Sequence, residues 1–321
     1  MNDPIRQIYV ILNPIAGHSD VDDVRQAVED LCNRQNWEFE IYETTGEENV
    51  ADVARKAVRE GANLVVAAGG DGTVAGVVNG LVNTGVPLGI IPVGTGNGLA
   101  RAMNIPLVLD DVMQLFSGDF IIEDVDTLQV GDQHFVLNVS TGISSRAMLK
   151  TEPEDKKRFG VLAYAQTILK DVMDTQPVIF NLDLDEHQLR VQGTEVLVSN
   201  GVMAQEPAYF FGKRHEFSDG KLEVNILTAS ETPQFIRLIW DVLLDPREPK
   251  EDLHDLTVKK YIRLDVEDGP QPVQADGELI GETPVEITIA PKSIRILVPK
   301  EEEQQSKEEK EQKEKEIGQA S

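Results

Sequence analysis

An apolar run that breaks into glycines near residue 70 constrains the fold of this chain more than any other stretch. Residues 64–68 read Leu-Val-Val-Ala-Ala and lead into Gly69-Gly70-Asp71-Gly72-Thr73, so a buried strand is expected to end in a tight turn before a helix over 74–82. In open α/β sheets, ligands bind at such carboxyl ends of strands, where glycines and free helix N–H groups suit a phosphate. The pattern also fits a plain strand–helix turn in which Asp71 or Thr73 caps the helix.

A second turn of the same kind follows. Residues 87–92 form another apolar run, which leads into Gly94-Thr95-Gly96-Asn97 and a short helical segment that carries Arg101. Because the carboxyl ends of neighbouring parallel strands share one edge, the two turns are expected to face one crevice. The spacing matches neither the dinucleotide fingerprint nor the P-loop, so a phosphate there would depend on backbone amides, Thr95, Asn97 and Arg101. Arg101 fits an exposed helix charge equally well.

Strands and helices alternate over the first 120 residues. Apolar runs over 8–12 and 39–42 are each followed by a helical pattern, and Asn13 stands at the carboxyl end of the first run. The order β-α-β-α-β-α predicts parallel strands joined by right-handed crossovers. This part is therefore expected to form an α/β domain.

The pattern changes after residue 120. Segments rich in β-forming residues run from there to 298, with helical insertions expected near 160–173 and 233–244. They predict a second, mostly antiparallel β domain. Within it, Asp276-Gly277-Glu278 reads first as a hairpin turn, although its two carboxylates could also act on a hydroxyl or a metal. The Glu/Lys/Gln run over 300–321 is typical of a disordered charged tail.

The composition narrows the classes of partner. A formal charge of −26, from 30 basic and 56 acidic residues, argues against nucleic acid and against lasting attraction to anionic lipid. The single cysteine, Cys32, rules out an intrachain disulfide framework. The sequence shows no secretion signal and no apolar stretch near the roughly 20 residues of a membrane span. We therefore expect a cytoplasmic protein whose visits to a membrane surface are transient.

The motifs, taken in order, resemble those of the diacylglycerol kinase catalytic family, especially the bacterial soluble lipid kinases, with sphingosine and ceramide kinases as more distant relatives. Any one motif is weak, because the glycine-glycine-aspartate turn also occurs in NAD kinases and phosphofructokinases, but the ordered set is specific. It extends from about residue 6 to 299. The matching stretches are 13–17, 69–73 with 78–81, 92–97 with 100–101, 137–142, 198–201, 218–222 and 276–278.

The resemblance implies two domains with a cleft between them. Residues 1–124 would form an α/β domain that binds ATP, and residues 125–290 an antiparallel β-sandwich for the lipid, with the last strand, about 291–299, returning to the first domain. The implied reaction transfers the γ-phosphoryl group of ATP to the hydroxyl of a diacylglycerol-like lipid, with Mg²⁺ bridging the phosphates. An edge strand of the sandwich could pair in a homodimer.

The resemblance also assigns roles to single residues. Asp276 and Glu278 match the late pair from which the family draws the base that activates the hydroxyl. Asp71 would lie beside the phosphates, as an alternative base or in a Mg²⁺ network, and Asp126 resembles an aspartate that joins such a network. The implied nucleotide-binding positions are Asn13, Gly17, Gly69, Gly70, Gly72, Thr73, Gly94, Thr95, Gly96, Asn97 and Arg101.

Three departures from the family pattern keep alternatives open. Ala16 replaces a serine, Ala75-Gly76 replace Asn-Glu, and Gly98 replaces an aspartate that sphingosine and ceramide kinases also lack. Losing the glutamate and the aspartate together is expected to weaken metal handling. One alternative is a homologue that binds nucleotide or lipid but turns over poorly. The other alternative is an NAD-kinase-like enzyme. Three features argue against it: the loop that begins with Asn13-Pro14, the second glycine turn, and Asp276-Gly277-Glu278.

Overall fold

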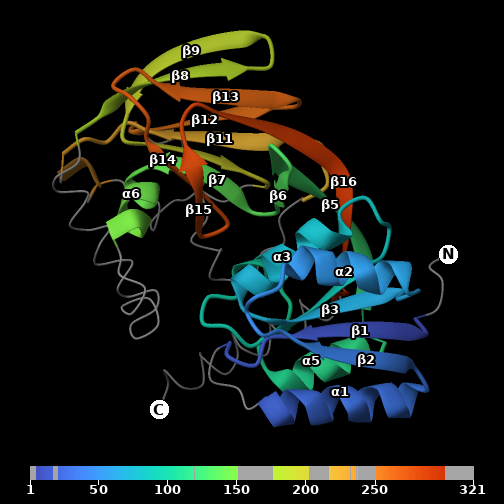
Figure 1. Ribbon diagram of the computed structural model, residues 1–321. Helices are drawn as coiled ribbons and strands as arrows, with labels where there is room; N and C mark the ends of the chain where they lie inside the picture. Colours follow the sequence, from blue (N-terminus) through green and yellow to red (C-terminus); the bar gives the residue numbers. More distant parts are fainter. Residues whose placement is uncertain are drawn as a thin grey trace, which may run out of the picture.

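The computed structural model describes residues 5–16, 21–118, 120–150, 176–201, 217–231, 233–235, 237 and 251–300. It has an α/β part and a β-rich part, shown in the lower and upper halves of Figure 1. One ten-stranded sheet runs through both parts, and a six-stranded sheet completes the β-rich part. This architecture confirms the expected α/β domain with an antiparallel β-sandwich. Gly17, the insertion expected near 160–173, most of that near 233–244 and tail residues 301–321 lie outside the described residues.

Parallel strands form the α/β part of the large sheet. Their order is β2 (Glu38–Glu43), β1 (Gln7–Leu12), β3 (Leu64–Gly69) and β4 (Leu88–Pro92). The last three of these strands are buried almost throughout, because helices cover both faces of the sheet. On one face lie α2 (Val50–Arg59) and α3 (Asp71–Leu81), and on the other α1 (Val21–Gln35) and α5 (Leu109–Phe116) (Figure 1). The short helix α4 (Gly98–Ala102) follows β4.

Two glycines let α3 pack closely against α2. A Cβ atom at Gly76 would lie 2.7 Å from Cβ of Val50, and one at Gly80 would lie 2.5 Å from Cβ of Ala54. Both distances are too short for carbon atoms in contact, so the surface of α3 that faces α2 is built for glycine. Position 76 therefore serves helix packing.

The β-rich part packs two antiparallel layers around an apolar core. One layer continues the large sheet with β16 (Val285–Pro299), β13 (Tyr261–Val266), β8 (Val178–Leu184) and β9 (His187–Gly193); β5 (Phe120–Val130) pairs with β16, and β6 (Gln133–Phe135) with β5. The other layer has the order β12 (Leu253–Val258), β11 (Leu222–Leu227), β10 (Glu195–Ser199), β7 (Asn138–Gly142), β14 (Pro272–Ala275) and β15 (Glu278–Glu282). Side chains such as Phe180 and Val198 fill the core between them, and α6 (Ile143–Lys150) follows β7.

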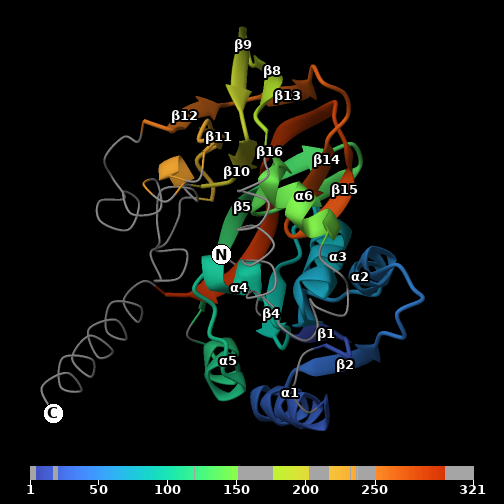
Figure 2. The same ribbon diagram turned by 90° about the vertical axis from the view of Figure 1, so that its left-hand side faces the viewer.

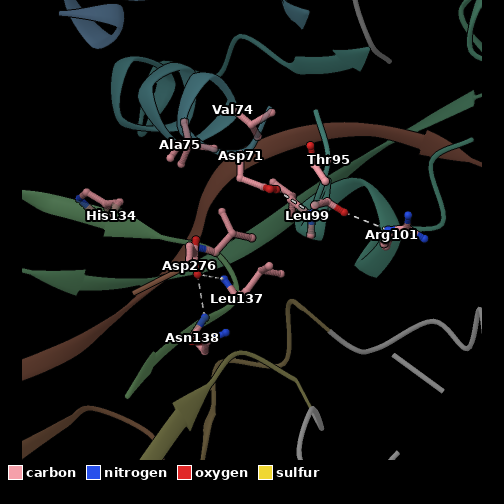
Figure 3. Close-up of a pocket in the computed structure, with 14 residues that line it drawn as sticks. Asp71, Val74, Ala75, Thr95, Leu99, Arg101, His134, Leu137, Asn138 and Asp276 are labelled. Atoms are coloured by element: carbon pink, nitrogen blue, oxygen red, sulfur yellow. Dashed lines mark hydrogen bonds between the residues drawn. The ribbon is translucent and has the colours of Figure 1, made fainter. Parts of the chain in front are cut away.

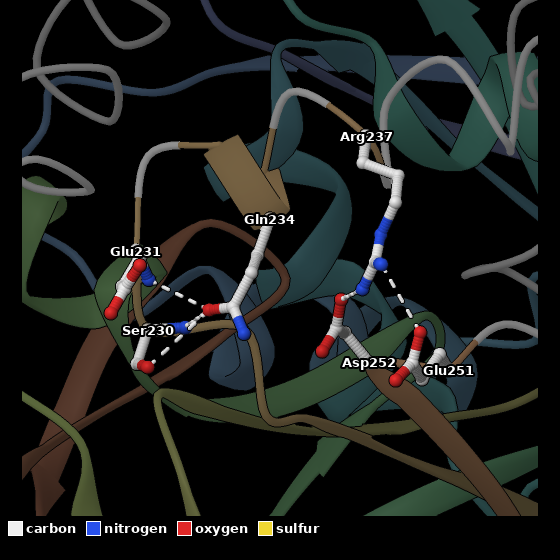
Figure 4. A network of polar contacts seen from close by, with 6 residues as sticks. All are labelled: Ser230, Glu231, Gln234, Arg237, Glu251 and Asp252. Carbon is white, nitrogen blue, oxygen red and sulfur yellow. Dashed lines mark hydrogen bonds and ion pairs between the residues drawn. The ribbon is translucent and has the colours of Figure 1, made fainter.

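Polar contacts hold the described residues that lie between β11 and β12. Arg237 forms ion pairs with Glu251 and Asp252, directly before β12 (Figure 4). The side-chain oxygen of Gln234 accepts the backbone N–H group of Glu231 at 2.9 Å. The ion pairs connect the segment after β11 to the residues directly before β12, the outer strand of the second sheet.

Two long strands, β5 and β16, join the two parts. β16 pairs with β13 near its start, at Tyr261↔Thr288, and with β4 near its end, at Ile296↔Leu88. β5 runs antiparallel beside β16, as Figure 2 shows. The domain limits expected at 124/125 and 290/291 thus fall inside continuous strands.

Candidate active site

A cavity of about 460 Å³ lies between the two parts. Its α/β wall comes from α3, α4 and the turn before α4, and its β wall comes from the β6–β7 segment and the turn after β14 (Figure 3). Apolar side chains make up much of both walls. A cavity with apolar walls and a few convergent polar groups is typical of a small-molecule site. The polar side chains that line it are Asp71, Thr95, Arg101, His134, Asn138 and Asp276.

Asp71 links the two glycine turns. Its Oδ1 accepts the backbone N–H of Gly98 at 2.6 Å, and its Oδ2 accepts that of Asn97 at 3.1 Å. These are N–H groups that a helix leaves unpaired at its start, so Asp71 caps α4. The alternative in which Asp71 or Thr73 is the N-cap of its own helix is wrong, because Gly70 is the N-cap of α3.

The two glycine turns also touch through their backbones. A Cβ at Gly94 would lie 2.5 Å from Cα of Gly70, so only glycine fits there. Asn97 shapes the second turn from a left-handed conformation with φ of 53°. Its Oδ1 accepts the N–H of Gly94 at 3.0 Å, and its Nδ2 donates to the carbonyl of Gly94 at 2.8 Å. The structure thus brings the two turns to one edge of the sheet.

A third loop joins them from the end of β1. Nδ2 of Asn13 donates to Oγ1 of Thr73 at 3.2 Å, and Oδ1 of Asn13 accepts the N–H of Ile15 at 3.1 Å. Thr73 is buried against Gly69, where a Cβ would lie 2.4 Å from Oγ1. Thr73 therefore ties α3 to β1. The expected contacts of Asn13 and Thr73 with a nucleotide stay predictions.

Thr95 and Arg101 stand at the mouth of the cavity. Both side chains are exposed. Nε of Arg101 donates to the carbonyl of Gly96 at 2.9 Å, so the guanidinium braces the second turn from α4. A positive charge is thereby held beside the turn where an anion is expected.

Asp276 comes from the opposite wall, in the turn between β14 and β15. Its Oδ1 accepts the backbone N–H groups of Leu137 at 3.0 Å and Asn138 at 2.8 Å, and its Oδ2 accepts that of Val136 at 2.8 Å. Burial raises the pKa of this carboxyl to about 6; the charge of Asp71 adds to the rise, and the three N–H groups oppose it. A carboxylate accepts about four hydrogen bonds, so one position is left for a hydroxyl in the cavity.

Glu278 stands apart from Asp276. Its side chain is exposed, and its Oε1 would lie 3.0 Å from a Cβ placed on Gly72. Glu278 therefore reaches from β15 to the first turn of α3, where a negative charge is favourable. The structure separates the late carboxylate pair: Asp276 lines the cavity and Glu278 lies over a helix start.

Asp126 lies in the junction between the two parts. It is fully buried, and its Oδ1 accepts the N–H of Lys292 at 2.6 Å while its Oδ2 accepts that of Gly220 at 2.8 Å. Within the described part of the chain, no group of three or more His, Cys, Asp or Glu side chains is arranged to hold a metal. The expected metal role of Asp126 stays a prediction.

The departures from the family pattern have different surroundings. Position 76 faces Val50 of α2, so the absent glutamate leaves no gap at the cavity. Ala75 and Gly98 do line the cavity, and a Cβ at Gly98 would lie 3.6 Å from Oδ1 of Asp71. An effect on metal handling is therefore expected from position 98.

The sequence assigned no role to His134 and Asn138, although both line the cavity. Nδ1 of His134 lies 2.8 Å from Oγ1 of Thr127, and burial lowers the pKa of its imidazole, which is therefore neutral at pH 7. Asn138 stands in the matched stretch 137–142, and this was the only signal for it.

Comparisons with known proteins agree with this division into two parts. Residues 7–130 match the family model described as diacylglycerol kinase catalytic domain, and residues 137–298 match the one described as YegS C-terminal NAD kinase beta sandwich-like domain. An uncharacterized protein of Synechocystis sp. is 28% identical over 309 residues, which cover 91% of this chain and 70% of that protein. The diacylglycerol kinase of Bacillus subtilis is 27% identical over 310 residues, 94% of this chain and 99% of that enzyme. A diacylglycerol kinase structure from Bacillus anthracis shares the fold, with a TM-score of 0.74 and 20% identity over 92% of this chain and 98% of that one.

Proposed function

The chain belongs to the family that joins a diacylglycerol kinase catalytic domain to a YegS C-terminal β-sandwich-like domain, and on this premise we propose that it is an ATP-dependent kinase of a diacylglycerol-like lipid. A lipid kinase is what the family and the named relative support. The observation that carries the finer proposal is the placement of Asp276 across the cavity from Asp71. Asp71 belongs to the glycine turns, and Asp276 keeps one hydrogen-bond acceptor position for a hydroxyl.

We assign the nucleotide phosphates to the glycine turns. The starts of α3 and α4 meet there, and the glycine backbone with the positive end of the α3 dipole favours anions. Mg²⁺, when bound, would neutralise charge on the transferring phosphoryl group. Asp71 is the carboxylate that fits it, because Mg²⁺ in such sites takes one or two carboxylates besides phosphate oxygens and water. Arg101 adds a positive charge at the mouth.

We assign Asp276 as the general base. With a pKa of about 6 the carboxyl is ionised at neutral pH and still basic enough to take the proton of an attacking hydroxyl. The three backbone N–H groups hold it in one orientation, so no rearrangement is needed during the reaction. Val74, Val78 and Leu99 offer the acceptor an apolar wall.

The acceptor would be taken from a bilayer surface during a brief contact. A net charge of −26 opposes a lasting hold on anionic lipid. Over the part of the chain that the structure describes, there is no helix with the length and apolarity to span a membrane. Cytoplasmic location with transient membrane contact belongs to this proposal, and pairing of edge strands in a homodimer stays a prediction.

The test is transfer of labelled γ-phosphate from Mg·ATP into diacylglycerol, ceramide, sphingosine or phosphatidylglycerol in detergent micelles. Wild type is expected to label diacylglycerol best. Asp276→Asn should lower kcat by about 10²–10⁴-fold, as loss of a general base does, with little change in ATP affinity. Glu278→Gln is the matched control, and because its carboxylate lies outside the cavity we expect a much smaller loss.

Two outcomes would replace the proposal. ATP binding without label in any lipid, over a range of divalent metals, would point to a homologue that binds but turns over poorly. Label transferred to NAD and to no lipid would point to an NAD-kinase-like enzyme.

A further inference from the structure

A chain of hydrogen bonds starts at the turn that carries Asp276. Oε1 of Gln274 accepts the N–H of Gly277 at 3.1 Å. Nε2 of the same side chain donates to Oδ1 of Asn138 at 2.9 Å and to Oγ of Ser140 at 2.6 Å. Gln274 thus connects the catalytic turn to two residues of the neighbouring strand β7.

The chain ends at a glutamate on β10. Oγ of Ser140 lies 2.7 Å from Oγ of Ser144, and Ser144 donates its hydroxyl to Oε1 of Glu195. Oε2 of Glu195 accepts the backbone N–H of Ser144 at 3.0 Å. Both Ser140 and Gln274 are buried, so water does not compete for these contacts.

The two ends of the chain fix its direction. A backbone N–H can only donate, so Gln274 presents its oxygen to Gly277 and its NH₂ group to Asn138 and Ser140. Asn138 must then present its Oδ1 to Gln274. In this orientation the NH₂ group of Asn138 points away from Gln274. At the far end Ser144 donates its hydroxyl to Glu195, and Oγ of Ser140 accepts from Gln274, so both hydroxyls of the chain donate toward Glu195.

Asn138 meets the cavity at the position where an acceptor is expected. It lines the cavity, and its backbone N–H binds Asp276. Its Nδ2 has no hydrogen-bond partner among the described residues. We propose that Nδ2 of Asn138 donates a hydrogen bond to a second oxygen of the acceptor lipid, and that the chain ending at Glu195 keeps the amide in this orientation. Asn138 would contact substrate, whereas Glu195 and Ser144 would be positioning residues.

This inference rests on the proposed function and specifies its substrate. The preferred acceptor carries an oxygen with a free lone pair close to the reacting hydroxyl. A diacylglycerol has such an oxygen in its neighbouring ester group, and a straight-chain fatty alcohol has none. Selection of the acceptor would therefore depend on the donor group of Asn138.

The experiment compares diacylglycerol with a fatty alcohol in the same micelles, for wild type and Asn138→Ala. The variant should lose about tenfold in kcat/KM for diacylglycerol, the value of one hydrogen bond of ~1.4 kcal/mol, and almost nothing for the alcohol. If the alcohol is not phosphorylated, its inhibition constant against phosphorylation of diacylglycerol is measured instead. This constant should be the same for wild type and Asn138→Ala.

Ser144 and Ser145 provide a matched pair in the first turn of α6. Ser144 belongs to the chain, whereas among the described residues Oγ of Ser145 has only local contacts: it accepts the N–H of Gly142 at 3.0 Å and donates to its carbonyl at 3.2 Å. Ser144→Ala and Glu195→Gln should each lower the preference for diacylglycerol severalfold. Ser144→Ala removes a hydroxyl of the chain, and the amide of Glu195→Gln has one oxygen in place of the two that accept the N–H and the O–H of Ser144. Ser145→Ala should keep the preference.

Equal losses on both acceptors, or the same effect for Ser144→Ala and Ser145→Ala, would overturn the inference while leaving the kinase proposal standing. Failure of wild type to phosphorylate any lipid would overturn both. Melting temperatures and ATP affinity, measured for every variant, separate loss of selection from loss of fold.

Discussion

Among single residues, Asp276 has a chemistry that depends strongly on its surroundings. Burial and the charge of Asp71 favour its protonated form, and three backbone N–H groups favour the ionised form, with a pKa of about 6 as the result. As the pH falls through this value the carboxylate takes up a proton and can no longer accept one from the hydroxyl. We expect kcat/KM for the lipid to fall below about pH 6, whereas an ordinary aspartate would keep activity to near pH 4.

A pH–rate profile checks this expectation. Glu278→Gln should leave the acidic limb of the profile in place, because this carboxylate is exposed and lies outside the cavity. An acidic limb near pH 4, or one that moves with Glu278→Gln, would remove Asp276 from the role of base.

Gly98 offers a gain-of-function prediction at the same scale. Its Cβ position lies 3.6 Å from Oδ1 of Asp71 and in ordinary contact with Leu137, so a side chain fits there. Gly98→Asp would place a second carboxylate beside Asp71, and Mg²⁺ binds carboxylates together with phosphate oxygens. We expect the Mg²⁺ concentration that gives half-maximal activity to fall severalfold. Gly98→Asn, which adds similar volume without charge, is the control, and an equal effect of both variants would refute the prediction.

The sequence revealed some of these residues and not others for a physical reason. Gly94 has to be glycine because its backbone touches that of Gly70, and this requirement appears in the sequence as a short local motif. The contacts of Asn138 and Glu195 depend on side chains from three strands and a helix. No local pattern announces a hydrogen-bond chain whose members lie as far apart in sequence as positions 138, 195 and 274.

At the scale of elements, the contact between α2 and α3 sets a limit on the sequence of α3. Gly76→Ala would improve helix propensity by about 1 kcal/mol, which alone would stabilise the protein. The added Cβ would meet Val50 at 2.7 Å, however, and overpacking of this kind costs about 1–3 kcal/mol. We expect a lower melting temperature, and a lower one still for Gly76→Glu, by thermal unfolding. A rise in melting temperature for Gly76→Ala would contradict this expectation, because it would show that α2 moves away from the added methyl group at little cost in free energy.

The periodicity of the sequence predicted most elements correctly. Alternating strands and helices in the first 120 residues, and β-rich segments afterwards, appear as β1 to α5 and β5 to β16. The helix start at Asp71 was misjudged because its carboxylate binds N–H groups of another helix, α4. Such a long-range contact overrides the local capping preference of aspartate.

At the scale of the whole molecule, Asp126 fastens β16 to the segment before β11. Asparagine in its place has one acceptor oxygen for the two N–H groups of Lys292 and Gly220 and turns an NH₂ group toward one of them. We expect Asp126→Asn to lower the free energy of unfolding by about 1–3 kcal/mol, the cost of an unsatisfied buried group.

The metal chelator EDTA decides between this role and a metal site. If Asp126 acts through the two N–H groups, wild type and Asp126→Asn should differ equally with and without EDTA. A loss of wild-type stability in EDTA, down to the level of the variant, would instead establish the metal role.

β16 (Val285–Pro299) lies between β4 of the α/β part and β13 of the β-rich part, and of the strands in the described residues it is the last to be synthesised. While a ribosome is still making residues 285–299, the neighbouring edge of β4 has no partner, and unpaired strand edges invite association with other chains. The α/β part is synthesised first, but its parallel strands gain their last neighbour only when β16, which also pairs with the β-rich part, has been made. A nascent chain stalled before β16 would contain every residue of the two glycine turns and would still lack the strand that joins them to the β wall of the cavity.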